Sequence, residues 1–235
     1  MGAMARLTGF SAPKQLGVPG PIGQAVQVAE GDVWADGQFP MLLGVVSENR
    51  LVKGLSLPYY GFIEVGKGPS QRGFEAVNRG GICMSVSTKT ACSYEVMHYF
   101  AEAITARRKV EDISMVELCL SESIGNASIH GNLGIDGSLR STREGFEQFS
   151  RLMSDRLADP ELSMRRVEVN FLPLEQDGFR ISVTDDGDGF DISMTGRRAT
   201  DTGAKHGRGL ALIRSIATRV DSEDGGRTLV MDFKE

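Results

Sequence analysis

The sequence predicts an α+β protein: a two-layer sandwich in which helices pack on a largely antiparallel sheet, preceded by a β-rich N-terminal extension. Helical periodicity dominates residues 91–158, and most of the alternating segments that predict strands come later. This order favours the α+β class over repeated βαβ units. The character of the sequence also changes near residue 80. We therefore divide the chain into the extension, residues 1–79, and the main domain, residues 80–235.

The extension is less regular than the rest of the chain. Residues 5–40 are rich in Gly, Pro and Gln, which predicts loop or extended chain. Short apolar runs at 41–46, 51–57 and 59–65 then predict two or three strands in a small β module. Its aromatic density is unusual for a linker, so we expect a dimer or partner surface, or a segment folded over the main domain.

The main domain has clear periodicity. The expected elements are, in order, a strand at 82–86, helices at 91–108, 113–130 and 141–158, strands at 167–171 and 179–184, a helix at 209–220 and a strand at 228–233. A capping-box pattern at Ser141–Glu144 opens the third helix. Phe146, Phe149, Met153 and Leu157 form its apolar stripe.

Composition excludes several functional classes. The net charge of −5 leaves no basic excess for a nucleic-acid backbone, so we expect no nucleic-acid partner. The chain has three scattered cysteines, Cys83, Cys92 and Cys119, without metal spacing, which favours reduced thiols in a cytoplasm. No apolar run approaches the length of a membrane span and no signal pattern opens the chain, so we expect no membrane association.

The first candidate site lies on the helix at 113–130. On a helical wheel, Glu122 and Asn126 fall inside the apolar arc and project together, with His130 following on the same side. The Asn126 carbonyl oxygen could coordinate Mg²⁺, and Glu122 could deprotonate a nucleophile one water away. The alternative is that both side chains hydrogen-bond a neighbouring loop. For His130, a structural role at the helix end is the alternative.

The second candidate site follows the strand at 179–184. Asp185 ends this strand, and Gly187 and Gly189 allow the backbone to approach a planar or phosphate ligand closely. A carboxylate in the position of Asp185 can accept a hydrogen bond from an exocyclic amine such as adenine N6. The alternative is a plain turn. We interpret Asp186 and Asp188 as solvated turn residues.

The third candidate site opens the helix at 209–220. Gly207 and Gly209 expose backbone N–H groups where the helix dipole favours anions, and Leu210 begins the apolar helix. Lys205 and Arg208 add positive charge, together with the preceding Arg197 and Arg198. This combination predicts a phosphate site, although a glycine turn of this kind is a weak signal by itself.

The order of the three sites carries more information than any one of them. We call them the first, second and third boxes: Glu122 to His130, Asp185 to Gly189, and Gly207 to Leu210. Their order resembles the Bergerat-fold (GHKL) ATPase superfamily of gyrase, the ninety-kilodalton heat-shock chaperones, histidine kinases and MutL. The run Ser121-Glu-Ser-Ile-Gly-Asn-Ala-Ser-Ile-His-Gly131 is most similar to bacterial anti-sigma-factor serine kinases. The resemblance covers roughly residues 80–235.

The resemblance implies ATP and Mg²⁺ as cofactors and gives roles to individual residues. Glu122 matches the general base, Asn126 the Mg²⁺ ligand and Asp185 the acceptor for adenine N6. Gly187 and Gly189 match the adenine-side loop; Gly207, Arg208 and Gly209 match the phosphate end. The long extension and the helix at 141–158 depart from the family pattern, which leaves the partner open.

The function implied is a serine/threonine protein kinase in a bacterial partner-switching system. Its partner would be an anti-anti-sigma (STAS-type) protein, a sigma factor or a similar regulator, and a homodimer is expected because family members tend to dimerise. One alternative is an ATP-dependent binding or sequestering module without turnover. Another is the catalytic part of a histidine kinase, for which His98 is the only upstream phosphoacceptor candidate.

Overall fold

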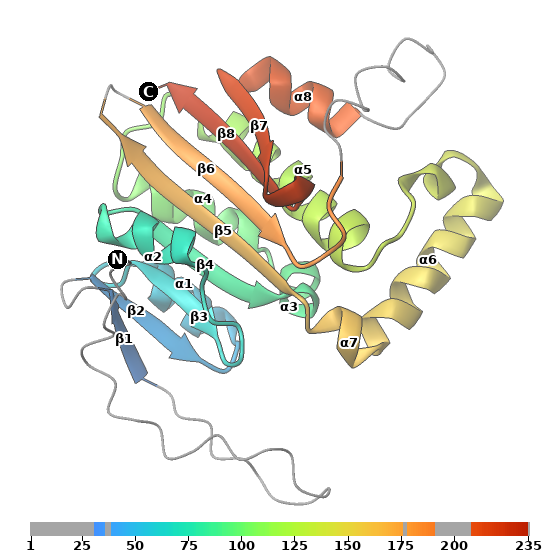
Figure 1. Cartoon of the computed structure of the whole chain (residues 1–235), viewed down its shortest axis with the longest axis horizontal. Coiled ribbons are helices and arrows are strands. Elements are labelled where there is room, and N and C mark those ends of the chain that lie inside the picture. Colours follow the sequence, from blue (N-terminus) through green and yellow to red (C-terminus); the bar gives the residue numbers. More distant parts are fainter. Residues whose placement is uncertain (1–30, 36–38, 176–177, 191–207, 235) are drawn as a thin grey trace, which may run out of the picture.

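The computed structural model describes residues 31–35, 39–175, 178–190 and 208–234. These residues form a single eight-stranded sheet with the strand order β1-β2-β3-β4-β5-β6-β8-β7 (Figure 1). The strands are β1 Gly31–Ala35, β2 Phe39–Gly44, β3 Gly61–Glu64, β4 Ile82–Ser87, β5 Arg166–Leu174, β6 Gly178–Asp185, β7 Arg219–Glu223 and β8 Thr228–Lys234. The predicted α+β class is confirmed.

Helices connect the strands. They are α1 Glu48–Leu55, α2 Gln71–Asn78, α3 Thr88–Ser93, α4 Val96–Thr105, α5 Ile113–Gly125, α6 Arg143–Ala158, α7 Pro160–Ser163 and α8 Arg208–Ile216. A π-helix, η1, continues α5 over Asn126–Asn132, and short 3₁₀ turns occur at Gly137–Ser141 (η2) and Asp224–Gly226 (η3). No helix in this described part of the chain is long and apolar enough to cross a bilayer.

The main core lies between one face of the sheet and the helices α1, α4, α5 and α8. Strand residues of odd number in β5, β6 and β8, such as Phe171 and Phe179, point into it because side chains alternate along a strand. The other face is covered in part by α2, which packs on Met41, Ile63 and Cys83. Figure 1 shows α2 on the opposite side of the sheet from α4 and α5.

The sheet runs without interruption from the extension into the main domain. Strands β2, β3 and β4 are parallel neighbours, and the two helices that connect them, α1 and α2, cover opposite faces. The two crossovers therefore have opposite hands, an unusual arrangement because such crossovers are nearly always right-handed. The division of the chain near residue 80 stays a prediction, but the sheet and the main core both extend across it.

Arg107 adds a polar link between the two parts of the chain. Its guanidinium group donates hydrogen bonds to the carbonyl oxygens of Leu55 and Tyr59, which belong to the extension, and to that of Ala103 in α4. Burial lowers the pKa of this side chain from its usual value. The end of α4 is thus tied to the chain between α1 and β3.

The strand expected at 51–57 was wrong, because Leu51 and Leu55 belong to α1. These side chains lie four residues apart and are both buried, so a helix places them on one face against the core. A Cβ added to Gly54 would lie 2.9 Å from the Cβ of Phe62, so the glycine lets α1 approach β3 closely. A short apolar run cannot by itself distinguish a buried helix from a strand.

Three other expectations need correction. The helix expected at 91–108 is interrupted: α3 ends at Ser93, and Tyr94 has an extended backbone before α4 begins. The helix expected at 209–220 ends at Ile216, because the following residues pair with β8 as the edge strand β7. In α6, Thr142 and not Ser141 is the N-cap, and no residue of the apolar stripe is buried; Phe146 is 56% exposed.

Candidate functional site

The helix α5 carries the first box at the border between core and surface. Asp112 caps the helix by accepting a hydrogen bond from the Ser114 backbone N–H at 3.1 Å. The buried arc passes through Val116, Cys119, Leu120, Ser123 and Ile124. Glu122 and Asn126 are half-buried at the edge of this arc, so the expectation that they lie inside it was only partly right.

Glu122 lies directly against the start of α8. A Cβ added to Gly209 would lie 2.2 Å from the Glu122 Oε2 atom, so the end of the Glu122 side chain would have to shift for any larger residue at this contact. The contact joins the first box to the third box. Burial, and then the nearby Glu122 carboxylate, raise the pKa of the Cys119 thiol to about 11. That thiol is therefore protonated near neutral pH.

The π-helix η1 carries the chain from the first box to the second. Its wider turns end at Asn132, and the Leu133 N–H donates to the Ser128 carbonyl oxygen, five residues back, at 2.9 Å. Such π-helical turns are rare in proteins overall, but those that occur are often found at functional sites. A Cβ on Gly131 would lie 2.5 Å from the Asp185 Cγ atom, and one on Gly187 would lie 2.3 Å from the Gly131 carbonyl oxygen. These two glycines let the first and second boxes touch.

Asp185 is a buried carboxylate at the end of β6, and only 7% of the residue is exposed. Burial raises the pKa of this carboxyl to about 6. A hydrogen bond that the Gly187 N–H donates to Oδ1 at 2.8 Å acts in the opposite direction and lowers the pKa. Within the described residues, Oδ2 accepts no hydrogen bond. Asp185 can therefore offer one oxygen to a ligand that brings a donor into the site.

The residues present fit adenine nucleotide with Mg²⁺. The close contacts at Gly131, Gly187 and Gly209 bring the three boxes together, and Asp185 supplies an acceptor for an amine. Among the described residues, the side chains of Glu122 and Asn126 make no hydrogen bond; the loop at 191–207 lies outside these residues, so the alternative that both bind a neighbouring loop stays open. No group of three or more His, Cys, Asp or Glu side chains suited to a metal occurs in this part of the chain. Asn126 would supply one oxygen ligand to the ion.

The remaining predicted site residues lie in different surroundings. His130 is exposed, and its Nδ1 atom lies 2.6 Å from the Ile135 carbonyl oxygen, which turns the ring toward the following loop. Leu210 is buried and anchors the start of α8 in the main core. Gly189 has a φ of 79° and approaches the Gly225 backbone, so its lack of a side chain serves the β7–β8 turn. Arg208 is the first residue of α8.

Two predicted site residues, Lys205 and Gly207, lie outside the described residues. The same holds for the basic residues Arg197 and Arg198. Their expected role at the phosphate end of the site stays a prediction.

Asn132 and Asp186 were not predicted as important, yet both organise the second box. Asn132 is fully buried, and its Oδ1 atom accepts a hydrogen bond from the Asp186 N–H at 2.8 Å. Asp186 is exposed, as interpreted from the sequence, but its carboxylate also accepts a hydrogen bond from the Arg166 N–H at 2.8 Å. Little in the sequence indicated the role of Asn132, which is only a polar residue after Gly131. The periodicity of an α-helix does not predict which residues a π-helix buries.

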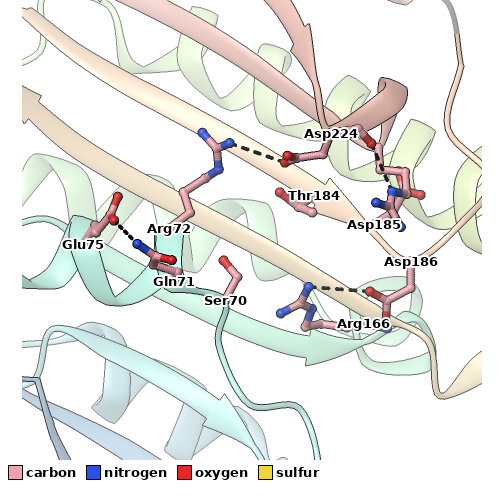
Figure 2. Close-up of a pocket in the computed structure, with 10 residues that line it drawn as sticks. Ser70, Gln71, Arg72, Glu75, Arg166, Thr184, Asp185, Asp186 and Asp224 are labelled. Carbon is pink, nitrogen blue, oxygen red and sulfur yellow. Dashed lines mark hydrogen bonds and ion pairs between the residues drawn. The ribbon is translucent and has the colours of Figure 1, made fainter. Parts of the chain in front are cut away.

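A polar cavity of 490 Å³ lies on the face of the sheet that carries α2. It is lined by Ser70, Gln71, Arg72, Glu75, Arg166, Thr184, Asp185, Asp186, Asp224 and Arg227. Figure 2 shows Arg72 reaching toward Asp224 and Arg166 toward Asp186. The N–O distances are 3.4 and 3.6 Å. Carboxylates thus balance these guanidinium groups, and the cavity has no strong preference for an anion.

Comparison with known proteins supports the same class. Residues 87–233 match the family described as the histidine kinase-like ATPase domain. The match covers more than half of the chain, so the protein belongs to this family of ATP-binding regulatory domains. No curated protein matches the chain.

Proposed function

We propose that this protein is a serine/threonine protein kinase of the anti-sigma-factor type, acting in a bacterial partner-switching system. The observation that supports this most strongly is the contact between Glu122 and Gly209. The first turn of a helix favours phosphate through its free N–H groups and its dipole. A carboxylate at that point lies where a hydroxyl group would approach the terminal phosphate of ATP.

In this mechanism the chain binds the two ends of ATP with different elements. Asp185, which packs against Gly131 and Gly187, accepts a hydrogen bond from adenine N6. The phosphates extend toward Gly209 at the start of α8. Asn126 would supply an oxygen ligand to Mg²⁺, and the ion would supply charge neutralisation for the transfer.

Glu122 then acts on the acceptor. It takes the proton from a serine or threonine hydroxyl of the partner protein, while the hydroxyl oxygen bonds to the γ-phosphorus. The bond from that phosphorus to the bridging oxygen breaks, and ADP leaves. A STAS-type anti-anti-sigma protein is the acceptor that the resemblance implies, and the sigma factor would be the protein released or bound.

The alternative of a histidine kinase requires a free phosphoacceptor histidine. His98 is exposed, but its Nδ1 lies 3.1 Å from Glu117 Oε1 and its Nε2 lies 3.4 Å from Glu102 Oε1. The hydrogen bond with Glu117 raises the pKa of His98. Because both ring nitrogens face carboxylates of the same domain, neither is free to approach a phosphate, which disfavours His98 as a phosphoacceptor.

The test is transfer of labelled γ-phosphate from ATP to the STAS-type proteins of the same genome. We expect acid-stable phosphoserine or phosphothreonine on one of them. Glu122→Gln should lower the rate by roughly 10²- to 10⁴-fold with little change in ATP affinity. Glu117→Gln, on the same helix, is the matched control and should transfer normally.

Three outcomes would contradict the kinase proposal. Equal rates for Glu122→Gln and the wild type would remove the general base. Acid-labile label on the chain itself would favour the histidine-kinase alternative. ATP-dependent capture of the partner without any transfer would favour the binding module.

A further inference from the structure

Three segments of the main domain are joined by a closed ring of hydrogen bonds behind the second box. The Asp186 N–H donates to Asn132 Oδ1 at 2.8 Å, and the Arg166 N–H donates to Asp186 Oδ2 at 2.8 Å. Asn132 Nδ2 closes the ring by donating to the Arg166 carbonyl oxygen at 2.9 Å. The ring connects the end of η1, the start of β5 and the loop after β6.

Several hydrogen bonds hold Asn132 in place. The residue is fully buried, its Nδ2 also donates to Thr88 Oγ1 at 2.8 Å, and its carbonyl oxygen accepts from Arg165 NH1 at 3.0 Å. A buried amide with this many partners is held in one orientation, because losing any of them would leave a polar group unsatisfied. The loop attached to it is held as well.

The ring lies next to the groups that would contact adenine. Gly131 precedes Asn132, and Asp185 precedes Asp186, so both sides of the Gly131–Asp185 contact are one residue from the ring. Asp185 and Gly187 flank Asp186, and they are joined by their own hydrogen bond. A shift of Asp186 would therefore move the Asp185 carboxylate relative to Gly131.

We propose that Asn132 and Asp186 are positioning residues that set the selectivity of the site for the adenine base. They touch no nucleotide themselves. They hold the Asp185 carboxylate at the distance and angle at which it accepts a hydrogen bond from an exocyclic amine and disfavours a carbonyl group in its place. This inference rests on the proposed role of Asp185 in ATP binding, but not on phosphoryl transfer.

The experiment compares ATP with inosine triphosphate, which has a carbonyl oxygen where adenine has its amine. Dissociation constants for both nucleotides with Mg²⁺ are measured near neutral pH by calorimetry on the full chain. For the wild type, inosine triphosphate should bind at least about tenfold more weakly, because two acceptors face each other. Asn132→Ala should reduce this ratio by about threefold or more, since a loosened second layer of contacts degrades a site's geometry.

Asp186 provides a second arm in case Asn132→Ala does not fold. Asp186 is exposed, so Asp186→Ala leaves the Arg166 N–H near water and should fold. It should lower the ratio in the same direction, whereas Asp186→Asn keeps an oxygen acceptor and should restore it. Asn170→Ala, which removes another buried amide from the opposite face of the sheet, should lower the unfolding temperature but leave the ratio unchanged.

The possible results separate the claims. A wild-type ratio retained in both Asn132→Ala and Asp186→Ala would overturn the positioning role. An equal loss of affinity for both nucleotides, with the ratio intact, would also overturn it and indicate a merely structural ring. A wild-type ratio near one would overturn the role of Asp185 and the inference together. Failure of the kinase proposal would leave all of these binding results unaffected.

Discussion

The extension and the main domain share one sheet, but they contribute different things to it. The extension joins through parallel pairing of β2, β3 and β4, whereas β4, β5, β6, β8 and β7 pair antiparallel in the main domain. All candidate ligand-binding residues that the structure describes lie in the main domain. The extension supplies Leu51, Leu55 and Phe62 to the same core. A segment without candidate chemistry is thus part of the fold that holds the site.

The largest effect is expected when the extension is separated from the main domain. Deleting residues 1–79 removes Leu51, Leu55 and Phe62, each fully or almost fully buried and each contributing about 1.5–3 kcal/mol by its burial. It also leaves β4 as an unpaired edge. We expect the shortened chain to lose its cooperative thermal transition, followed by circular dichroism. Deletion of residues 1–30 alone keeps every contact described above and is the control; cooperative unfolding of both chains would show the extension to be separable.

On the side of the main domain, the largest expected effect is at Gly131. In Gly131→Ala the new methyl group would overlap the Asp185 carboxylate, so ATP affinity should fall by roughly 10- to 100-fold. Gly125→Ala is the matched control, because a Cβ there meets nothing within 4 Å and its φ of −59° is helical. That change should raise the free energy of unfolding by about 0.5–1 kcal/mol and leave binding intact. Equal ATP affinity in the two variants would contradict the contact.

Glu168 lies at the junction between the extension and the main domain, where it contacts Ser70. This fully buried carboxylate accepts hydrogen bonds from the Ser70 N–H and hydroxyl, both at 2.6 Å, and from Asn170 Nδ2 at 2.8 Å. Glu168→Gln keeps the shape but turns an N–H₂ group toward one of these donors. The free energy of unfolding, measured with urea, should fall by about 2–3 kcal/mol. Ser70→Ala removes only the hydroxyl and should cost about 1 kcal/mol; a neutral Glu168→Gln would mean that α2 is not anchored there.

The mildest test uses pH. Asp185 has a pKa raised to about 6, so its ionised form predominates above pH 6 and its neutral form below. Because adenine N6 needs the carboxylate as acceptor, ATP affinity should weaken by roughly tenfold between pH 7 and pH 5. The affinity for inosine triphosphate relative to that for ATP should rise as the pH falls from 7 to 5, since a protonated carboxyl can donate a hydrogen bond to the carbonyl oxygen of the inosine base. A ratio of the two dissociation constants that does not change with pH would exclude Asp185 from the base contact.

The same group makes a prediction for the protein without ligand. A carboxyl whose pKa is higher in the folded than in the unfolded chain stabilises the fold fully below its unfolded pKa of about 3.8. This contribution is lost as the pH rises through about 6. Asp185→Asn should therefore flatten that part of the curve of unfolding temperature against pH, while other carboxyl groups still act at lower pH.

Much of the fold and of the site could be predicted because it depends on local patterns. The periodicity of 113–130 predicts the helix that carries Glu122, and strong alternation predicts β5 and β6. The identity of α1 could not be predicted, because Leu51 and Leu55 suit a strand or a helix until the neighbouring sheet is known. The π-helix escaped prediction for a similar reason. Its wider turns place Asn132 in the interior, and only contacts with β5 and the loop after β6 favour them.

The central claim is that the three boxes form one ATP site in which Asp185 recognises adenine. The most direct measurement is calorimetric titration of ATP with Mg²⁺ into the wild type and Asp185→Asn. We predict wild-type binding in the range of about 1 μM to 1 mM and at least roughly tenfold weaker binding by the variant. Absence of binding by the wild type, or equal affinity in the two proteins, would contradict the account.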